Sequence, residues 1–198
     1  MSLLISTILG LFFLGFACGS AEQQIRAGAE RMDLYLPQIL DKHIALVANH
    51  TSVVGASHLV DTLLSSGMDR DQLLKVFAPE HGFRGKLAAG ARVEDGIDPK
   101  TGIPIVSLYS SNHKPEPQDL EGVDLVVFDL QDVGARFYTY ISTLHYMMEA
   151  CAENGVPLLV LDRPNPNGGY VDGPILEPDY TSFVGMHPIP VVYGLTIG

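Results

Sequence analysis

The chain has 198 residues, of which 46% are hydrophobic and 18% are charged, a composition typical of a globular protein and not of a disordered one. Twelve Lys and Arg residues stand against 23 Asp and Glu residues, so the formal net charge is −11 at pH 7. This acidic balance argues against nucleic acid as a partner, because phosphate binding needs clustered Lys and Arg.

Residues 1–21 are predicted to be a signal peptide. Residues 3–17 form an almost unbroken apolar run, which is shorter than the roughly 20 residues of a membrane-spanning helix and suits the core of a secretory signal. Residues 15–18 resemble a bacterial lipobox that ends at Cys18, and ordinary cleavage after Ala21 is the alternative. Either route predicts an exported protein, periplasmic or held at the membrane only by lipid on Cys18.

The remaining chain alternates apolar runs with helical patterns. Buried strands are predicted at residues 43–49, 73–78, 103–109, 124–129 and 157–162, the third of them near a sheet edge because of its proline. Helices are expected within 21–40, ending near Pro37, around 59–64, and over 136–154 with Gly155 as the C′ residue. The last helix has a predicted buried stripe of Phe137, Ile141, Leu144, Met148 and Cys151. Apolar strands separated by helices predict an α/β fold, a parallel sheet with helices on both faces.

The end of the chain predicts one further strand at residues 189–193, followed by the turn into a helix at residues 194–198. A strand without its crossover helix exposes apolar surface. We therefore expect that the C-terminal part of the full protein is missing from this sequence.

Polar side chains accumulate where the predicted strands end. In a parallel sheet such ends converge on one edge, which is the usual ligand crevice. Helix capping is the alternative explanation for Asp132 and Asn165. The polar residues at the ends of the first, second, fourth and fifth strands are Asn49 and Thr51; Glu80, His81 and Arg84; Asp129, Asp132 and Arg136; and Asp162, Arg163, Asn165 and Asn167.

Several common site motifs are absent from the sequence. No G-x-G-x-x-G follows the first strand, and neither a Walker A loop, a G-x-S-x-G elbow nor an H-E-x-x-H pattern occurs. His81 with Asp129 or Asp132 lacks the spacing of metal ligands. We therefore predict no cofactor and no metal, and interpret the crevice as a carboxyl-, amide- and Arg-containing cleft of the kind that hydrolyses glycosides, with Glu80 as the acid.

Four motifs carry a resemblance to a known family. Residues 79–85, 131–140, 162–167 and 182–185 resemble the exo-β-N-acetylmuramidase family of peptidoglycan hexosaminidases, and the similarity runs from about Ile25 to Gly198. The resemblance implies that residues 22–198 are a Rossmann-like catalytic domain without a nucleotide, truncated before a smaller C-terminal domain. It implies release of N-acetylmuramic acid from the non-reducing ends of peptidoglycan fragments, so muramyl saccharides are the expected partners.

The resemblance also implies roles for individual residues. Glu80 is the expected catalytic acid, and Asp132 is our candidate for the second carboxylate, with Asp129 behind it. The lactyl carboxylate of N-acetylmuramic acid predicts a bidentate clamp by Arg84, Arg136 or Arg163. The cleft residues that match the motifs are Asn49, His81, Arg84, Asp132, Arg136, Tyr138 and Asn165.

Three mechanisms stay open: a retaining pair of carboxyl groups, an inverting pair of carboxyl groups, and attack by the acetamido group of the substrate in place of a protein nucleophile. The sequence does not set the oligomeric state. Two other classes of function stay open as well, a non-catalytic sugar-binding lipoprotein of the cell wall and a metal-dependent hydrolase or deacetylase.

Overall fold

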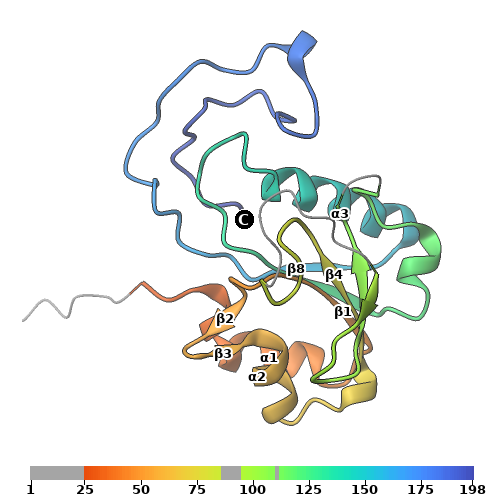
Figure 1. Cartoon of the computed structure of the whole chain (residues 1–198). Helices are drawn as coiled ribbons and strands as arrows, with labels where there is room; N and C mark the ends of the chain where they lie inside the picture. Colours follow the sequence, from red (N-terminus) through yellow and green to blue (C-terminus); the bar gives the residue numbers. More distant parts are fainter. Residues whose placement is uncertain (1–24, 86–94, 110–111) are drawn as a thin grey trace, which may run out of the picture.

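The computed structural model describes residues 25–85, 95–109 and 112–198 (Figure 1). The expected signal peptide and the expected lipidation site at Cys18 lie outside these residues. Within the described part of the chain, no helix has both the length and the apolar character needed to cross a membrane. The helices are α1 (Met32–Ile39), α2 (Leu59–Ser65) and α3 (Tyr140–Asn154), with 3-10 turns at Gly28–Glu30, Arg70–Gln72, Pro117–Leu120 and Pro178–Tyr180.

A twisted, mostly parallel sheet forms the centre of the molecule. In spatial order its strands, as far as the structure describes the chain, are β5 (Gly96–Ile97), β6 (Pro104–Ser107), β4 (Leu73–Ala78), β1 (Ile44–Ala48), β7 (Leu125–Asp129) and β8 (Leu158–Val160). The pairs β6–β4, β4–β1, β1–β7 and β7–β8 are parallel, and β5 is antiparallel to β6. A separate antiparallel hairpin consists of β2 (Val53–Val54) and β3 (Ser57–His58).

The core lies on both faces of the sheet because the side chains of each strand alternate between them. In β1, Ile44 and Leu46 pack in a cluster with residues of α1 and α2, whereas Ala45 and Val47 pack with residues of α3. Figure 1 shows the same arrangement, with α1 and α2 on one side of the strands and α3 on the other. The predicted α/β fold with helices on both faces is confirmed.

The strand order contains a point where the direction of the winding changes. Numbered along the chain, the parallel strands described here lie in the order third, second, first, fourth, fifth, so β1 has the second strand on one side and the fourth on the other. This is the doubly wound order of Rossmann-like domains, in which ligands bind outside the carboxyl ends of the strands at the switch point. The fold therefore places the expected crevice beyond the ends of β1, β4 and β7.

The strand predictions hold to within a few residues, and β6 does lie next to the edge strand β5. The predicted end of the first helix is wrong, because α1 continues through Pro37 to Ile39. Pro37 is exposed, so its ring faces solvent, while Tyr35 and Ile39 hold the helix in the core. Continued burial of the apolar face thus outweighs the backbone hydrogen bond that the proline removes.

The third helix begins later than predicted, at Tyr140 instead of Arg136, although Gly155 ends it in the left-handed conformation (φ 66°) as expected. The predicted stripe is partly wrong, since Phe137 and Met148 are about half exposed. The apolar residues of α3 that are buried in the core are Leu144, Met147, Ala150 and Cys151.

The predicted strand at residues 189–193 is also wrong. Val192 forms only isolated bridges, with Ala135 and with Asp172. After β8 the chain runs away from the sheet in a long excursion and then returns (Figure 1), and the N–H of Gly198 donates to Asp162 at 3.1 Å. Residues 189–193 therefore pack beside the segment that precedes α3 and do not extend the sheet.

Candidate active site

A cavity of about 370 Å³ opens at the carboxyl ends of the central strands. Its walls come from the segments that follow β1, β4 and β7, which are the three strands of the switch point. This volume lies within the range that small-molecule sites occupy. The residues that line it are His50, Thr51, Glu80, His81, Gln131, Val133, Phe137, Tyr138, Thr139 and Tyr140.

Glu80 stands where β4 leaves the sheet, two residues after Ala78, the buried end of that strand. Its side chain is partly buried, and the Tyr109 hydroxyl, from the segment after β6, donates to Glu80 Oε1 at 3.4 Å. Among the described residues that line the cavity, Glu80 is the one carboxylate. The predicted acid therefore lies in the cavity, within hydrogen-bond reach of a neighbouring strand end.

The turn after Glu80 has an unusual backbone. His81 has φ 71° and is followed by Gly82, also at φ 71°. A left-handed conformation costs a residue with a side chain about 1–2 kcal/mol, and such strain collects at functional sites. The backbone thus turns sharply between Glu80 and the buried ring of Phe83, and the imidazole of His81 lines the cavity.

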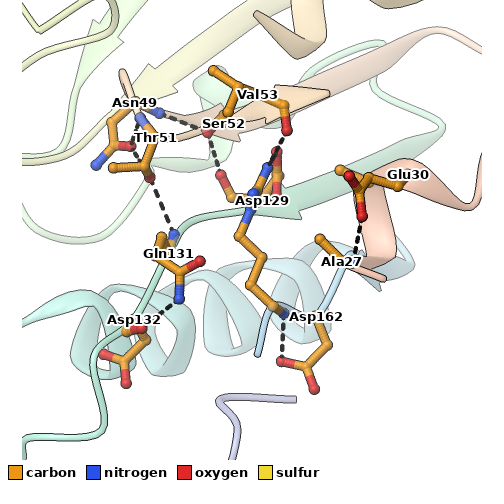
Figure 2. A network of polar contacts seen from close by, with 12 residues as sticks. Ala27, Glu30, Asn49, Thr51, Ser52, Val53, Asp129, Gln131, Asp132 and Asp162 are labelled. Atoms are coloured by element: carbon orange, nitrogen blue, oxygen red, sulfur yellow. Dashed lines mark hydrogen bonds and ion pairs between the residues drawn. The ribbon is translucent and has the colours of Figure 1, made fainter. Parts of the chain in front are cut away.

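Asn49 lies behind the wall and not in it. Its side chain is fully buried, its Nδ2 donates to the Tyr140 hydroxyl at 2.7 Å, and its Oδ1 accepts from both the N–H and the hydroxyl of Thr51. The Thr51 hydroxyl in turn accepts from the N–H of Gln131 at 3.2 Å. Figure 2 shows this chain of contacts from Asn49 through Thr51 to Gln131. The predicted cleft residue is therefore a positioning residue for three wall residues.

Aromatic rings form the wall that precedes α3. Phe137 and Tyr138 are each about half exposed, with ring centroids 5.9 Å apart, and the Tyr140 hydroxyl lies against Asn49. Burial and the nearby charge of Glu80 raise the pKa of Tyr140 to about 12, so this phenol stays protonated at neutral pH. These rings give the cavity apolar faces and hydroxyl groups together.

The predicted second carboxylate does not reach the cavity. Asp132 is buried, and its Oδ2 accepts from the N–H of Gly134 at 2.7 Å and from the hydroxyl of Tyr193. Its carboxylate points away from Thr51 in Figure 2. Burial and the carboxylate of Asp132 raise the pKa of Tyr193. Asp132 therefore fixes the returning C-terminal stretch, and its expected catalytic role is not supported by this geometry.

The three arginines predicted to bind the substrate carboxylate are engaged elsewhere. Arg84 binds Asp98 and Asp61, with distances of 2.8–3.2 Å. The buried Arg163 forms a bidentate pair with Asp129, at 2.6 and 2.9 Å, and also donates to the carbonyl of Val53.

Arg136 donates to the carbonyls of Pro174 and Ile189, so it holds the C-terminal excursion. Like Arg84 and Arg163, it does not line the cavity.

Asn165 is also structural. Its Nδ2 donates to the carbonyl of Leu195, and its Oδ1 accepts from the N–H of Asn167, both at 2.8 Å. A Cβ on Gly134 would lie 2.1 Å from Asn165 Nδ2, so the glycine allows the two segments to meet. Among the described residues, moreover, no three His, Cys, Asp or Glu side chains gather closely enough to hold a metal ion.

Comparison with known proteins places this geometry in a family. The family model "Exo-beta-N-acetylmuramidase NamZ, N-terminal" matches residues 44–198, which span the sheet and every wall of the cavity. The chain belongs to the NamZ family. It is 50% identical over 171 residues to the peptidoglycan β-N-acetylmuramidase NamZ of Bacillus subtilis (strain 168). That alignment covers 83% of this chain and 40% of the relative, so the chain spans about two fifths of the length of the curated protein that it matches.

Two solved structures of DUF1343 family proteins from Bacteroides fragilis NCTC 9343 share the NamZ-family fold seen here. One, BF0379, is 46% identical with a TM-score of 0.75, and the match covers 87% of this chain and 44% of that chain. The other, BF0371, is 38% identical with a TM-score of 0.77, and the match covers 87% of this chain and 43% of that chain.

Of the residues predicted for this NamZ-family site, Glu80, His81 and Tyr138 line the cavity. Thr51 was predicted to stand at a strand end, whereas His50, Gln131 and Tyr140, which also line the cavity, were not predicted as site residues. Their positions carried a usable signal, because each follows a predicted strand or stands in the motif at residues 131–140.

Proposed function

We propose that this chain carries the active centre of an exo-acting glycoside hydrolase that releases N-acetylmuramic acid from the non-reducing ends of peptidoglycan fragments during cell-wall turnover. The observation that carries the proposal is the position of Glu80, in the cavity at the switch point of a NamZ-family domain. The Bacillus subtilis relative is named as a peptidoglycan β-N-acetylmuramidase, which supports the same substrate class.

In this proposal Glu80 is the general acid. It protonates the glycosidic oxygen while the bond from that oxygen to C1 of the sugar breaks and positive charge develops on the ring. Phe137 and Tyr138 offer faces on which a sugar ring packs, and the Tyr140 and Thr51 hydroxyls are hydrogen-bonding groups for its substituents.

The 2-acetamido group of the substrate is our proposed nucleophile. A protein nucleophile would need a second carboxylate about 5 Å from the first, and the described cavity residues supply none besides Glu80. The acetamido oxygen would bond to C1 as the leaving group departs. Water would then attack C1, lose its proton to the Glu80 carboxylate and release the sugar with its β configuration retained.

The test is hydrolysis of a chromogenic N-acetylmuramic acid β-glycoside by the full protein. We expect Glu80→Gln to lower kcat at least about 100-fold, because the amide cannot donate an acidic proton. Glu149→Gln is the matched control, since Glu149 is an exposed carboxylate on α3 outside the cavity, and it should keep full activity.

The other outcomes separate the competing interpretations. Sugar binding without turnover by the wild type would indicate a binding protein, and loss of turnover in EDTA would indicate a metal-dependent hydrolase. NMR of the first product tests the stereochemical outcome, since an α-configured sugar would contradict the acetamido route and indicate inversion.

We also propose that the protein is exported and anchored by lipid on Cys18. The support is the apolar run at residues 3–17 and the lipobox-like residues 15–18. Fractionation of cells that express Cys18→Ser tests this, because the variant should leave the membrane fraction if the anchor is that cysteine.

A further inference from the structure

Few of the described groups that line the cavity can carry positive charge, although the proposed substrate is an anionic sugar. The titratable groups that line it are Glu80, His50, His81, Tyr138 and Tyr140. Glu80 carries negative charge when ionised, and phenols are neutral near pH 7. Among the described residues of the wall, the two imidazoles are therefore the groups that can carry positive charge.

Two arginines that stand close to these strand ends, Arg84 and Arg163, are already neutralised. Arg84 lies between the carboxylates of Asp98 and Asp61, and Arg163 is buried against Asp129. Withdrawing either guanidinium from its partner would leave a buried carboxylate unpaired, which costs about 3–5 kcal/mol. Among the residues that the structure describes, a ligand in the cavity thus meets imidazoles and not guanidinium groups.

The two histidines come from neighbouring strand ends and are held in place by the backbone. His50 follows β1, and His81 follows β4, with ring centroids 6.1 Å apart in an edge-to-face arrangement. Gly85 packs directly on His50, since a Cβ at position 85 would lie 2.5 Å from His50 Cβ and 2.8 Å from its Cγ. The turn that carries Glu80 and His81 therefore also positions His50.

Resting on the proposed function, we infer that His50 and His81 form the subsite for the lactyl carboxylate of N-acetylmuramic acid. Imidazolium N–H groups donate charge-assisted hydrogen bonds to a carboxylate, and these are stronger than bonds between neutral groups. The same pair gives a neutral sugar no such advantage. His50 and His81 would thus be specificity-determining residues that favour N-acetylmuramic acid over N-acetylglucosamine, which lacks the lactyl group.

The experiment compares three chromogenic β-glycosides on the full protein: N-acetylmuramic acid, its lactyl amide and N-acetylglucosamine. We expect His50→Gln to lower kcat/KM about tenfold for the acid, equivalent to the loss of one charge-assisted hydrogen bond, and to change it less than twofold for the two neutral sugars.

His43→Gln is the matched control. His43 directly precedes β1, at the opposite end of the strand from His50, and its side chain is largely exposed beside Asp124. This variant should keep the wild-type preference. His81→Gln should weaken the preference in the same direction as His50→Gln, with thermal unfolding measured to show that both variants are folded.

The failures are distinguishable. If the wild type hydrolyses none of the three sugars, the proposed function is wrong. If it hydrolyses the acid and both His variants keep the acid-to-amide ratio, the function stands and the histidine subsite is overturned. An equal loss on all three sugars also overturns it, because that pattern indicates a general role in shaping the cavity.

Discussion

Asn49 connects three wall residues of the cavity although its own side chain never reaches the cavity. It donates to Tyr140 and accepts twice from Thr51, which in turn accepts from Gln131. A buried amide stabilises the fold when both its donor and its acceptor are hydrogen-bonded. Removing one partner of such a bond leaves the other as an unpaired buried polar group, which costs free energy. The side chain of Asn49 therefore connects the parts of the cavity wall that follow β1 and β7.

We predict the outcome of a double-mutant cycle on Asn49 and Tyr140. Asn49→Ala and Tyr140→Phe should each lower the free energy of unfolding by about 1–3 kcal/mol, since each leaves the other partner unpaired. The double variant should lower the free energy of unfolding by roughly 1 kcal/mol less than the two single variants added together, because the second change removes the group that the first left unpaired. Urea unfolding measures all three.

Tyr180→Phe is the control, since Tyr180 is 72% exposed and its removal should change the free energy of unfolding by less than about 0.5 kcal/mol. Strict additivity of the Asn49 and Tyr140 variants would show that the hydrogen bond between them contributes nothing.

The sequence predicts which polar residues stand at strand ends but not which ones face the cavity. Glu80 and His81 do, whereas Arg84 and Arg163 turn to carboxylates 14 and 34 residues away. Such partners come from other elements of the fold, and no local pattern indicates them. An arginine beside a strand end is as suited to joining elements as to binding a ligand.

Arg84 joins α2 to the segment before β6 through Asp61 and Asp98. Burial disfavours the ionised form of Asp98, but the hydrogen bonds from Arg84 and Thr101 outweigh this and lower its pKa to about 2. A carboxyl whose pKa is lower in the folded state than its ordinary 3.8 stabilises the fold above that value. This contribution is lost as the pH falls from about 4 to about 2.

We therefore expect acid to weaken the wild type more than Asp98→Asn. Between pH 5 and pH 2 the free energy of unfolding should fall by about 2 kcal/mol more in the wild type, at about 1.4 kcal/mol per pKa unit. Urea unfolding at both pH values checks this. Asp41→Asn, which removes an exposed carboxylate, should follow the wild type, and an Asp98→Asn variant that does the same would contradict the prediction.

The strands were the most predictable elements, because β1, β4 and β7 are apolar runs buried on both faces. The start of α3 was not. Apolar residues fit a helical spacing back to Phe137, yet the segment before Tyr140 forms the cavity wall, where an exposed aromatic ring is useful. Periodicity reports where a helix is possible, while the tertiary structure decides where it begins.

For the molecule as a whole, the N-terminal stretch closes the outer side of the sheet next to β8. The N–H of Gly28 donates to the carbonyl of Asp162 at 2.6 Å, and Ala29 is fully buried in the core cluster of α1 and α2. A Cβ on Gly28 would lie 2.7 Å from backbone atoms of both Leu161 and Asp162. Only glycine lets the two segments approach this closely.

Gly28→Ala should therefore lower the free energy of unfolding by about 1–3 kcal/mol, because the added methyl group must displace backbone and not a flexible side chain. Chemical denaturation measures the change. Gly169→Ala is the control, since a Cβ there meets nothing within 4 Å, and it should be nearly neutral. Equal stability of the two variants would mean that the N-terminal stretch does not stabilise the edge.

The left-handed backbone at His81 also limits which sequences this turn accepts. Glycine, asparagine and aspartate tolerate such a conformation best, whereas β-branched side chains are strongly disfavoured in it. His50 follows β1 at an exposed position without a positive φ. In a saturation library of the two positions, surviving folded clones would be diverse at position 50 and narrow at position 81, so under the proposed histidine subsite substrate preference is easier to redesign from position 50.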